Sequence, residues 1–365
     1  MGFTCGIIGL PNVGKSTLFN AMTAASAEVA NYPFCTVDPN RGIAAVPDSR
    51  LERLAAAMSP EKVTPAQLEV LDIAGLVRGA HRGEGLGNRF LGHIRTVDAT
   101  LHVVRVFDDS NVSHMEASLD PIRDVEVVET ELMLADLEQV ERRLEKTHKR
   151  IKVGDKQAKL EVPVLEEMKG ALAAGRPLRG LSFESEGTAR PLLGELALLT
   201  AKPVIYIANV DEGHLAAPGP AMTALFEHAA LLGAKVVPVC ARLEAELLEL
   251  EPAERVAFSA ELGIKESALF RVIRAGYDIL GLQTFYTTVG PELRAWTIPA
   301  GTQAARAAGR IHSDMERGFI RAEVLHWEDF ERFGCESAAR DAGRMHLEGR
   351  DYEVRDGDLI RFRFA

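Results

Sequence analysis

The stretch Gly9-Leu10-Pro11-Asn12-Val13-Gly14-Lys15-Ser16 decides the fold, because it matches the phosphate-binding loop pattern G-x-x-x-x-G-K-[ST]. The apolar run 4–8 before it suits a buried strand, and residues 17–22 after it continue as a helix whose N-terminus faces the anion. In such a loop the lysine reaches the terminal phosphates and the serine hydroxyl binds Mg²⁺. The predicted nucleotide contacts in this region are Gly9, Pro11, Asn12, Val13, Gly14, Lys15, Ser16 and Thr17, with Lys15 also predicted as catalytic.

The bulk properties are those of a globular protein with several domains. A length of 365 residues suggests two or three domains, and 47% hydrophobic and 26% charged residues are ordinary values. A net charge of −11 argues against a generally basic nucleic-acid coat protein. No apolar run approaches the roughly 20 residues that span a bilayer, and the start lacks the basic region of a signal peptide. The four cysteines are scattered without a C-x-x-C pair, which predicts reduced thiols and a cytoplasmic location.

The order of strands and helices predicts an α/β fold with three parts. Residues 1–124 and 200–280 alternate apolar strands with helical stretches, as in a parallel sheet, and residues 125–199 form a helical insertion between them. The clearest strands are predicted at residues 70–73, 99–107, 202–209 and 235–239. Residues 281–365 predict a compact α+β domain, with short strands at 293–298, 322–325, 352–354 and 359–364.

The helical insertion shows the heptad spacing of a short coiled coil. A charged helix is predicted over residues 125–151. Its seam consists of two series that recur every seven residues, namely Met133, Val140 and Thr147, and Leu137, Leu144 and Ile151. A second helix is predicted from Val164 to Ala174, ending at Gly175.

The segment Asp72-Ile73-Ala74-Gly75 is the second chemical motif, at the end of a predicted buried strand. After a phosphate-binding loop, an Asp here holds Mg²⁺ and the N–H of the glycine meets the γ-phosphate. Taken alone, D-x-x-G usually marks only a turn. Thr36, in a proline-rich segment between the two motifs, is predicted to complete the Mg²⁺ coordination when the γ-phosphate is present, the alternative being an ordinary surface loop.

The chain closely resembles the Obg-like ATPases of the YchF type, which belong to the translation-factor class of P-loop GTPases. The resemblance covers the whole chain, and it is carried by residues 9–16, residues 31–40 and the specific stretch Asp72-Ile73-Ala74-Gly75-Leu76-Val77-Arg78-Gly79-Ala80-His81-Arg82-Gly83-Glu84-Gly85-Leu86-Gly87-Asn88. It implies a P-loop NTPase G domain, an inserted helical coiled-coil domain and a C-terminal TGS domain of ubiquitin-like fold. These match the three parts read above.

The base-recognition segment departs from that of a GTPase. GTPases carry N-K-x-D, whose Asp accepts hydrogen bonds from guanine, whereas this chain has Asn209-Val210-Asp211-Glu212. Adenine lacks the 2-amino group and presents N1 as an acceptor, so a guanine-reading carboxylate has no matching donor pair. The resembling family has N-x-x-E here and prefers ATP, which implies that Asn209, Val210 and Glu212 contact the adenine. The structural alternative is a helix cap after a strand.

The sequence lacks the usual residue that orients the attacking water. Ras-like GTPases have a glutamine directly after D-x-x-G, whereas this chain has Leu76. The resemblance implies His114 as a replacement, since a neutral imidazole accepts a hydrogen bond from water near pH 7. Asn12 is a further candidate. In related P-loop proteins with a hydrophobic residue after D-x-x-G, an Asn at this place helps bind K⁺, which offsets developing phosphate charge.

Cys35 lies beside Thr36 in the sequence. The simpler interpretation is a small apolar filler. The redox association of the resembling family implies instead a thiol whose oxidation disturbs the neighbouring loop.

A basic stretch indicates a partner with phosphate groups. Residues 142–159 contain eight Lys or Arg and two acidic residues, near the predicted tip of the helical hairpin. A solvated helix face is the alternative. The resemblance implies association of a monomer with the ribosome, at the large subunit and its rRNA, through the coiled-coil tip and the TGS domain. Four aromatic residues of the last part are predicted to form its core, namely Tyr286, Trp296, Phe319 and Phe364.

Two classes of function follow. The first is an ATPase that uses Mg²⁺ and K⁺ and whose slow hydrolysis cycle regulates translation or a stress response at the ribosome. The second is a nucleotide-gated binding protein in which turnover is incidental. A GTPase of the same architecture is a third reading.

Overall fold

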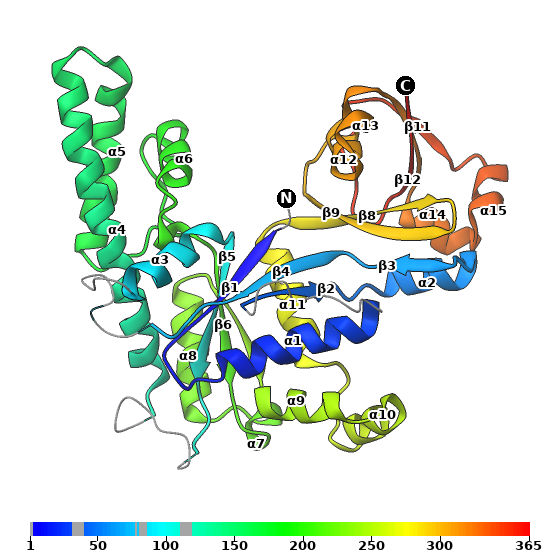
Figure 1. Cartoon of the computed structure of the whole chain (residues 1–365), viewed down its shortest axis with the longest axis horizontal. Coiled ribbons are helices and arrows are strands. Elements are labelled where there is room, and N and C mark those ends of the chain that lie inside the picture. The colour runs from blue at the N-terminus through cyan, green and yellow to red at the C-terminus, as the bar shows by residue number, and fades with distance from the viewer. Residues whose placement is uncertain (1–2, 31–39, 77–78, 80–85, 110–118) are drawn as a thin grey trace.

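A six-stranded sheet forms the centre of the N-terminal part (Figure 1). The structure is a computed structural model that describes residues 3–30, 40–76, 79, 86–109 and 119–365. The strand order is β2-β4-β1-β5-β6-β7. All neighbours pair in parallel except β2, which runs antiparallel to β4 at one edge. The bounds are β1 Thr4–Ile8, β2 Arg41–Ala45, β4 Gln67–Asp72, β5 Ala99–Arg105, β6 Val204–Asn209 and β7 Lys235–Val239.

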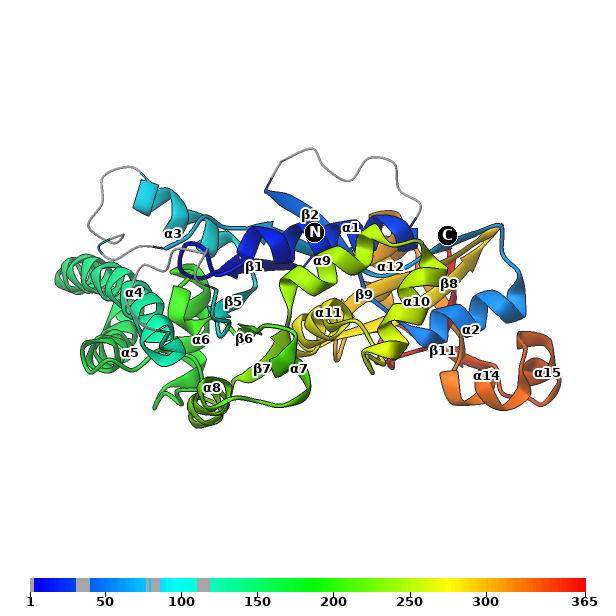
Figure 2. The same cartoon turned by 90° about the horizontal axis from the view of Figure 1, so that it is seen from below.

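Helices cover both faces of this sheet, which is why every residue of its central strands β5 and β6 is buried. Alternate residues of β6 belong to different cores: Ile205 and Ile207 pack with α1 and α11, while Tyr206 packs with α8. Figure 2 shows these helices on opposite sides of the strands. The helices of this part are α1 Lys15–Ala30, α2 Ser49–Met58, α3 Leu86–Thr96, α7 Gly213–Ala216, α8 Pro220–Leu231, α9 Ala241–Glu249, α10 Pro252–Glu261 and α11 Ala268–Ile279.

The insertion between β5 and β6 is a long helical hairpin of α4 Pro121–Lys152 and α5 Lys156–Ala173, followed by α6 Glu186–Glu195 and the short 3-10 helix η2 Leu199–Ala201. The hairpin projects from the sheet (Figure 1). Of the predicted seam, Val140, Leu144 and Thr147 are buried, and Met133 and Leu137 are partly buried. The predicted helix over residues 125–151 is present as α4. It starts four residues earlier, because Asp120 caps its N-terminus.

The predicted start of the second helix at Val164 is wrong. Asp155 accepts hydrogen bonds from the backbone N–H groups of Gln157 and Ala158, at 2.9 and 3.2 Å, and thereby starts α5 at Lys156. The helix then continues through Pro163, which cannot donate a backbone hydrogen bond. A tight turn at residues 153–155 therefore connects two helices that pack along much of their length.

A second six-stranded sheet forms the C-terminal part, in the order β11-β10-β12-β8-β9-β3. The bounds are β3 Lys62–Thr64, β8 Leu282–Val289, β9 Glu292–Pro299, β10 Phe319–Leu325, β11 His346–Glu348 and β12 Leu359–Phe364, with helices α12 Ala304–Ile311, α13 Ser313–Arg317, α14 Trp327–Phe333 and α15 Glu336–Asp341. The predicted strand at 352–354 is wrong, since Glu353 makes only an isolated bridge to Gln303. Phe364 is also not a core residue. It is 49% exposed at the end of the last strand, whereas Tyr286 and Phe319 are buried and Trp296 is partly buried.

The two sheets are joined by a strand from the N-terminal part. β3 pairs in parallel with β9, with Lys62 opposite Glu292 and Thr64 opposite Arg294. Nearby, Arg50 forms an ion pair with Asp356 at 2.8 Å. β3 therefore completes the C-terminal sheet, although it precedes most of the first sheet in the chain.

Among the described residues, every helix is either too short or too polar to cross a lipid bilayer.

Candidate nucleotide-binding site

The predicted phosphate-binding loop connects β1 to α1, which begins at Lys15. Gly9 and Gly14 have φ angles of 145° and 97°, which side-chain-bearing residues rarely adopt. A Cβ on Gly9 would lie 2.4 Å from the carbonyl oxygen of Val103, and one on Gly14 would lie 2.3 Å from Nδ2 of Asn209. Asn12 adopts a left-handed φ of 60°, which Asn tolerates better than most residues. The loop conformation thus depends on glycines at both of its ends.

Lys15 is held at the first turn of α1 with only 6% of its surface exposed. Its Nζ donates a hydrogen bond to the carbonyl oxygen of Leu10 at 2.7 Å. Burial lowers the pKa of Lys15 to about 8, and the nearby charge of Asp72 opposes that shift. Because an ammonium has three N–H donors, two remain for phosphate oxygens.

Ser16 and Asp72 face each other across the end of the sheet. Ser16 Oγ donates a hydrogen bond to Asp72 Oδ2 at 2.9 Å. A hydroxyl and a carboxylate are the oxygen donors that Mg²⁺ prefers, so the pair fits the predicted metal. Thr36, the third predicted ligand, lies outside the described residues.

Gly75 and Leu76 lie directly behind the loop. A Cβ on Gly75 would be 3.0 Å from the backbone nitrogen of Pro11 and 3.1 Å from Nζ of Lys15, so any larger residue would crowd the lysine. The backbone N–H of Leu76 donates to the carbonyl oxygen of Gly9 at 3.1 Å. The Leu76 side chain is buried in the core of the sheet. This position therefore supplies packing, with no polar group for a water molecule.

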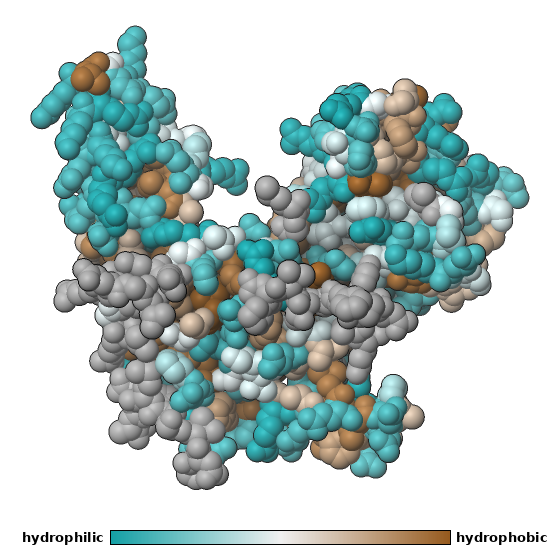
Figure 3. All heavy atoms as spheres, in the orientation of Figure 1, coloured by the Kyte–Doolittle hydropathy of each residue, from teal (hydrophilic) through white to brown (hydrophobic). Residues whose placement is uncertain are grey.

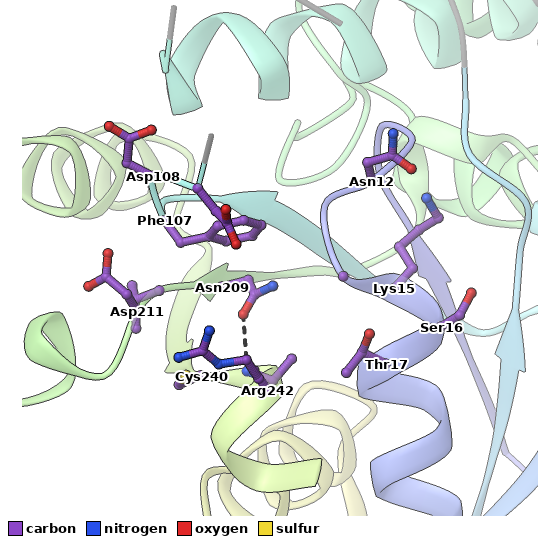
Figure 4. A pocket seen from close by; sticks show the side chains of 14 residues that line it. Asn12, Lys15, Ser16, Thr17, Phe107, Asp108, Asn209, Asp211, Cys240 and Arg242 are labelled. Atoms are coloured by element: carbon purple, nitrogen blue, oxygen red, sulfur yellow. Dashed lines mark hydrogen bonds between the residues drawn. The ribbon is translucent and has the colours of Figure 1, made fainter. Parts of the chain in front are cut away.

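A cavity of about 770 Å³ opens beside the loop at the carboxyl ends of the parallel strands, where α/β sheets bind ligands (Figure 4). The predicted residues that line it are Asn12, Gly14, Lys15, Ser16, Thr17, Asn209 and Val210. Gly9, Pro11, Val13, Gly75 and Glu212 are outside the lining. The structure thus brings the phosphate loop and the base-recognition segment to one cavity.

The side chain of Asn209 connects the phosphate loop to the start of α9 by two hydrogen bonds. Its Nδ2 donates to the carbonyl oxygen of Val13 at 2.9 Å, and its Oδ1 accepts from the backbone N–H of Ala241 at 3.1 Å. The second bond is drawn in Figure 4. Each of these side-chain atoms has capacity for one further hydrogen bond. Asn209 therefore has a structural role in addition to the predicted contact with adenine.

Val210 lines the cavity, whereas Glu212 lies outside its lining. The side chain of Val210 is buried, and its backbone N–H donates to the carbonyl oxygen of Val239 at 2.9 Å. Because this N–H is already hydrogen-bonded, the backbone group of Val210 that is left to contact a base is its carbonyl oxygen. Glu212 forms an ion pair with Arg242 at 3.3 Å, and it is Arg242 that lines the cavity.

Several lining residues were not predicted from the sequence. They are Phe107, Asp108, Asp109, Asp211, Cys240, Ala241 and Arg242. These residues lie at or just after the carboxyl ends of three predicted parallel strands, 99–107, 202–209 and 235–239, and that position was the available signal. Phe107 is held by Arg105, whose guanidinium carbon lies 4.5 Å from the ring centroid. Burial raises the pKa of the Cys240 thiol, which disfavours its thiolate form.

Two further predicted residues, His114 and Cys35, lie outside the described residues, as does Thr36. Of the other three cysteines, Cys5 is buried, with its pKa raised by burial to about 12. Cys335 is half-buried, and its side-chain hydrogen bond with Ser337 lowers the pKa of the thiol.

Curated proteins match this chain along its whole length. It is 50% identical over 366 residues to the Ribosome-binding ATPase YchF of Bacillus subtilis (strain 168), with 100% of both chains covered. It is also 50% identical over 364 residues to the protein of the same name from Haemophilus influenzae, covering 100% of this chain and 99% of that one. The chain belongs to the YchF family.

A solved structure and two family models agree with this assignment. The YchF GTPase of Schizosaccharomyces pombe superposes with a TM-score of 0.89 at 36% identity, covering 99% of this chain and 98% of that one. Residues 4–153 match the family described as 50S ribosome-binding GTPase. Residues 282–365 match the YchF-GTPase C-terminal family, described as a protein of unknown function. The predicted family and the predicted α/β P-loop fold are confirmed.

Proposed function

We propose that this chain binds ATP in the 770 Å³ cavity, hydrolyses it to ADP and phosphate, and acts as a slow nucleotide switch on the ribosome. The observation that carries the proposal is the shared cavity, in which Lys15 and Ser16 lie on one side and Asn209 and Arg242 on the other (Figure 4). A nucleotide has a charged phosphate end and a planar base end. The two sides of the cavity supply a matching group for each.

At the phosphate end, Lys15 acts as the cation for the terminal phosphates. Its bond to the Leu10 carbonyl fixes the direction of the ammonium group. The backbone N–H groups of the loop and the N-terminus of α1 add further donors for the anion. When ATP loses its γ-phosphate, negative charge moves to the bridging oxygen, and a fixed cation lowers the energy of that charge distribution.

Ser16 and Asp72 would hold Mg²⁺. Thr36, outside the described residues, is proposed as a third ligand. The ion supplies charge neutralisation for the triphosphate. In this proposal the Ser16 hydroxyl and the Asp72 carboxylate keep the ion beside the phosphates, and Gly75 keeps the space for Lys15 open.

At the base end, we propose that Glu212 acts through Arg242. Their ion pair places the guanidinium at the wall of the cavity, where it can stack on a purine face. Phe107 supplies a second flat surface in the lining. The Asn209 amide and the Val210 carbonyl remain available for the edge of adenine, which has a 6-amino donor.

Turnover is expected to be slow, because buried Leu76 replaces the residue that orients water in Ras-like enzymes. We propose His114 as the group that positions the attacking water. We also propose Asn12 as a ligand of K⁺ beside the phosphates, since it lies in the lining of the cavity.

Ribosome binding is proposed from the relatives and from charge. The bacterial relatives are named as ribosome-binding, and the basic stretch 142–159 covers the end of α4 and the start of α5. We propose that this hairpin tip and residues 281–365 contact the large subunit and its rRNA, that the protein acts as a monomer in the cytoplasm, and that residues 125–199 form a separate inserted domain. Cationic residues on a projecting hairpin suit phosphate groups.

The second candidate is a nucleotide-gated binding protein with incidental turnover, and the buried Leu76 favours it. Competitive titration of ATP against GTP, with and without K⁺, tests the base and ion assignments. Turnover measured with and without ribosomes separates the two candidates. Strong stimulation supports the switch driven by hydrolysis. Unchanged slow turnover with ATP-dependent ribosome binding supports the gated binding protein, and tighter binding of GTP would overturn the ATP assignment.

A further inference from the structure

Arg105, the last residue of β5, holds the segment that leaves this strand at the nucleotide cavity. The segment 106–109 belongs to no helix or strand, and three of its residues, Phe107, Asp108 and Asp109, line the cavity (Figure 4). Arg105 itself is outside the lining and is only 4% exposed. Its side chain therefore lies behind the wall of the cavity and not in it.

The guanidinium of Arg105 contacts this segment in three ways. Its Nε donates a hydrogen bond to the carbonyl oxygen of Phe107 at 3.2 Å, and its Nη2 donates to the carbonyl oxygen of Asp109 at 3.0 Å. Its Cζ lies 4.5 Å from the centroid of the Phe107 ring, within the range of a cation–π contact. Because a buried guanidinium costs free energy unless its N–H groups are hydrogen-bonded, these contacts favour one conformation of the segment.

The backbone of Arg105 is fixed as well. β5 pairs in parallel with β6, and Arg105 lies opposite Asn209 in this pairing. The backbone N–H of Val106 then donates to the carbonyl oxygen of Asn209 at 2.8 Å. Asn209 is also the residue that connects the phosphate loop to α9. Arg105 therefore ties Phe107 to the part of the site whose geometry Asn209 sets.

We infer that Arg105 is a positioning residue for the nucleoside half of the substrate and that it acts through Phe107. The inference rests on the proposed binding of ATP in this cavity. Since the guanidinium covers one face of the Phe107 ring, the other face is left for the planar base, and stacking requires the ring to be held in a suitable orientation. The phosphates bind at Lys15 and Ser16 in that proposal. Loss of Arg105 should therefore affect ATP more than a ligand that has no base.

The test compares ATP with inorganic triphosphate, which has no base, on the full-length protein with Mg²⁺. Arg105→Lys keeps the charge but removes the planar group that contacts the ring and two carbonyl oxygens. Arg105→Gln removes the charge as well, and it serves as the second variant if the first does not fold. We expect either variant to weaken ATP binding by roughly three- to tenfold and to leave triphosphate binding within about twofold of wild type, as measured by calorimetry.

Arg255→Lys is the matched control. Arg255 also donates to backbone carbonyl oxygens, those of Leu247 at 2.8 Å and Leu250 at 3.1 Å, and it lies outside the lining of the cavity. Its replacement should lower stability in urea to an extent comparable with Arg105→Lys, while ATP and triphosphate both bind as they bind wild type. A role of Arg105 in stability alone would make the two variants behave alike, and that result would overturn the inference.

A double-mutant cycle with Phe107→Leu tests whether Arg105 acts through the ring. In the Phe107→Leu background, Arg105→Lys should cause little further loss of ATP affinity, because the two substitutions remove the same contact. Fully additive losses would overturn this route. Equal weakening of ATP and triphosphate, or unchanged ATP affinity, would overturn the positioning role, while ATP binding and hydrolysis by wild type would leave the proposed function intact. A wild type that does not bind ATP contradicts both proposals.

Discussion

Asn209 Nδ2 donates a hydrogen bond to the carbonyl oxygen of Val13 at 2.9 Å, across 196 positions of sequence. Both groups are buried, and Asn209 Oδ1 also accepts from Ala241. One amide thus connects the phosphate loop, the end of β6 and the start of α9. The shape of the nucleotide cavity depends on this connection.

Asn209→Ala is expected to lower the free energy of unfolding by roughly 1–3 kcal/mol, because it leaves a buried carbonyl and a buried N–H without partners. ATP affinity should fall as well, since the phosphate loop loses its tie to α9. Urea unfolding and ATP titration measure the two effects. Asn209→Asp is a second variant: it keeps the acceptor for Ala241, but it turns a carboxylate oxygen towards the Val13 carbonyl, so its stability should also fall. Unchanged stability in Asn209→Ala would contradict the structural role.

Arg242→Ala is expected to weaken ATP binding about fivefold through loss of a stacking partner for the base. Glu212→Gln should cause a smaller loss, because it removes one of the two carboxylates that pair with Arg242 and leaves Glu246 at 3.6 Å. Inorganic triphosphate serves as the control ligand, since it has no base and should bind both variants as it binds wild type. Equal weakening of ATP and triphosphate would place Arg242 at the phosphates instead.

The affinity for ATP should depend on pH through Lys15. The pKa of Lys15 is lowered from 10.5 to about 8, so the ammonium is present below pH 8 and is lost as the pH rises through that value. Bound phosphates favour the protonated form and raise the pKa in the complex. Between the two pKa values, the dissociation constant should rise by up to about tenfold per pH unit. Titration from pH 7 to about 9.5 tests this. A flat profile in wild type, equal to that of Lys15→Ala, would show that Lys15 does not titrate in this range.

Leu76→Gln should not create a faster enzyme, because the side chain lies in the core and away from the cavity. An unpaired amide there is expected to cost roughly 1–3 kcal/mol of stability. A faster Leu76→Gln would contradict the packing role of Leu76.

His114→Ala should instead lower single-turnover hydrolysis and leave ATP affinity nearly unchanged. Unchanged single-turnover hydrolysis in His114→Ala would remove His114 from the mechanism.

Peroxide should lower the activity of wild type but not of Cys35→Ser, if Cys35 is the redox-sensitive thiol. Cys335→Ser is the necessary comparison, since Cys335 is half-buried and its pKa is lowered, which favours the reactive thiolate. Cys5 and Cys240 have raised pKa values and are expected to react slowly. Activity assays after peroxide treatment, with mass spectrometry of the modified cysteine, identify the sensor. Equal sensitivity of wild type and Cys35→Ser would exclude Cys35.

Local chemistry explains what could be predicted from the sequence. The conformation of residues 9–16 depends on glycines with unusual φ angles and on a helix start, and both are encoded within a few positions. The central strands β5 and β6 were predictable because burial on both faces makes them largely apolar, whereas the edge strand β2 was not predicted. The family resemblance then supplied the order of the parts, and the comparisons confirm the family and the fold.

Contacts distant in sequence could not be predicted in this way. The start of α5 is an exception, because its cap is local: Asp155 accepts from Gln157 and Ala158, and Pro163 inside the helix obscured that signal. The pairing of Glu212 with Arg242 joins two loops after different strands. The exposure of Phe364 follows from its place at the end of a strand, where an aromatic residue lacks a facing layer. The roles of His114, Thr36 and Cys35 stay predictions.

The parallel pairing of β3 with β9 has a practical consequence for dissecting this protein. A chain cut near residue 280 would separate β9 from the strand that covers its edge, and would part Arg50 from Asp356. The released fragment would present bare backbone donors and acceptors along β9, which promotes self-association. Loss of ribosome binding after such a truncation would therefore report damage to both fragments, and single substitutions are the safer way to assign roles to the C-terminal residues.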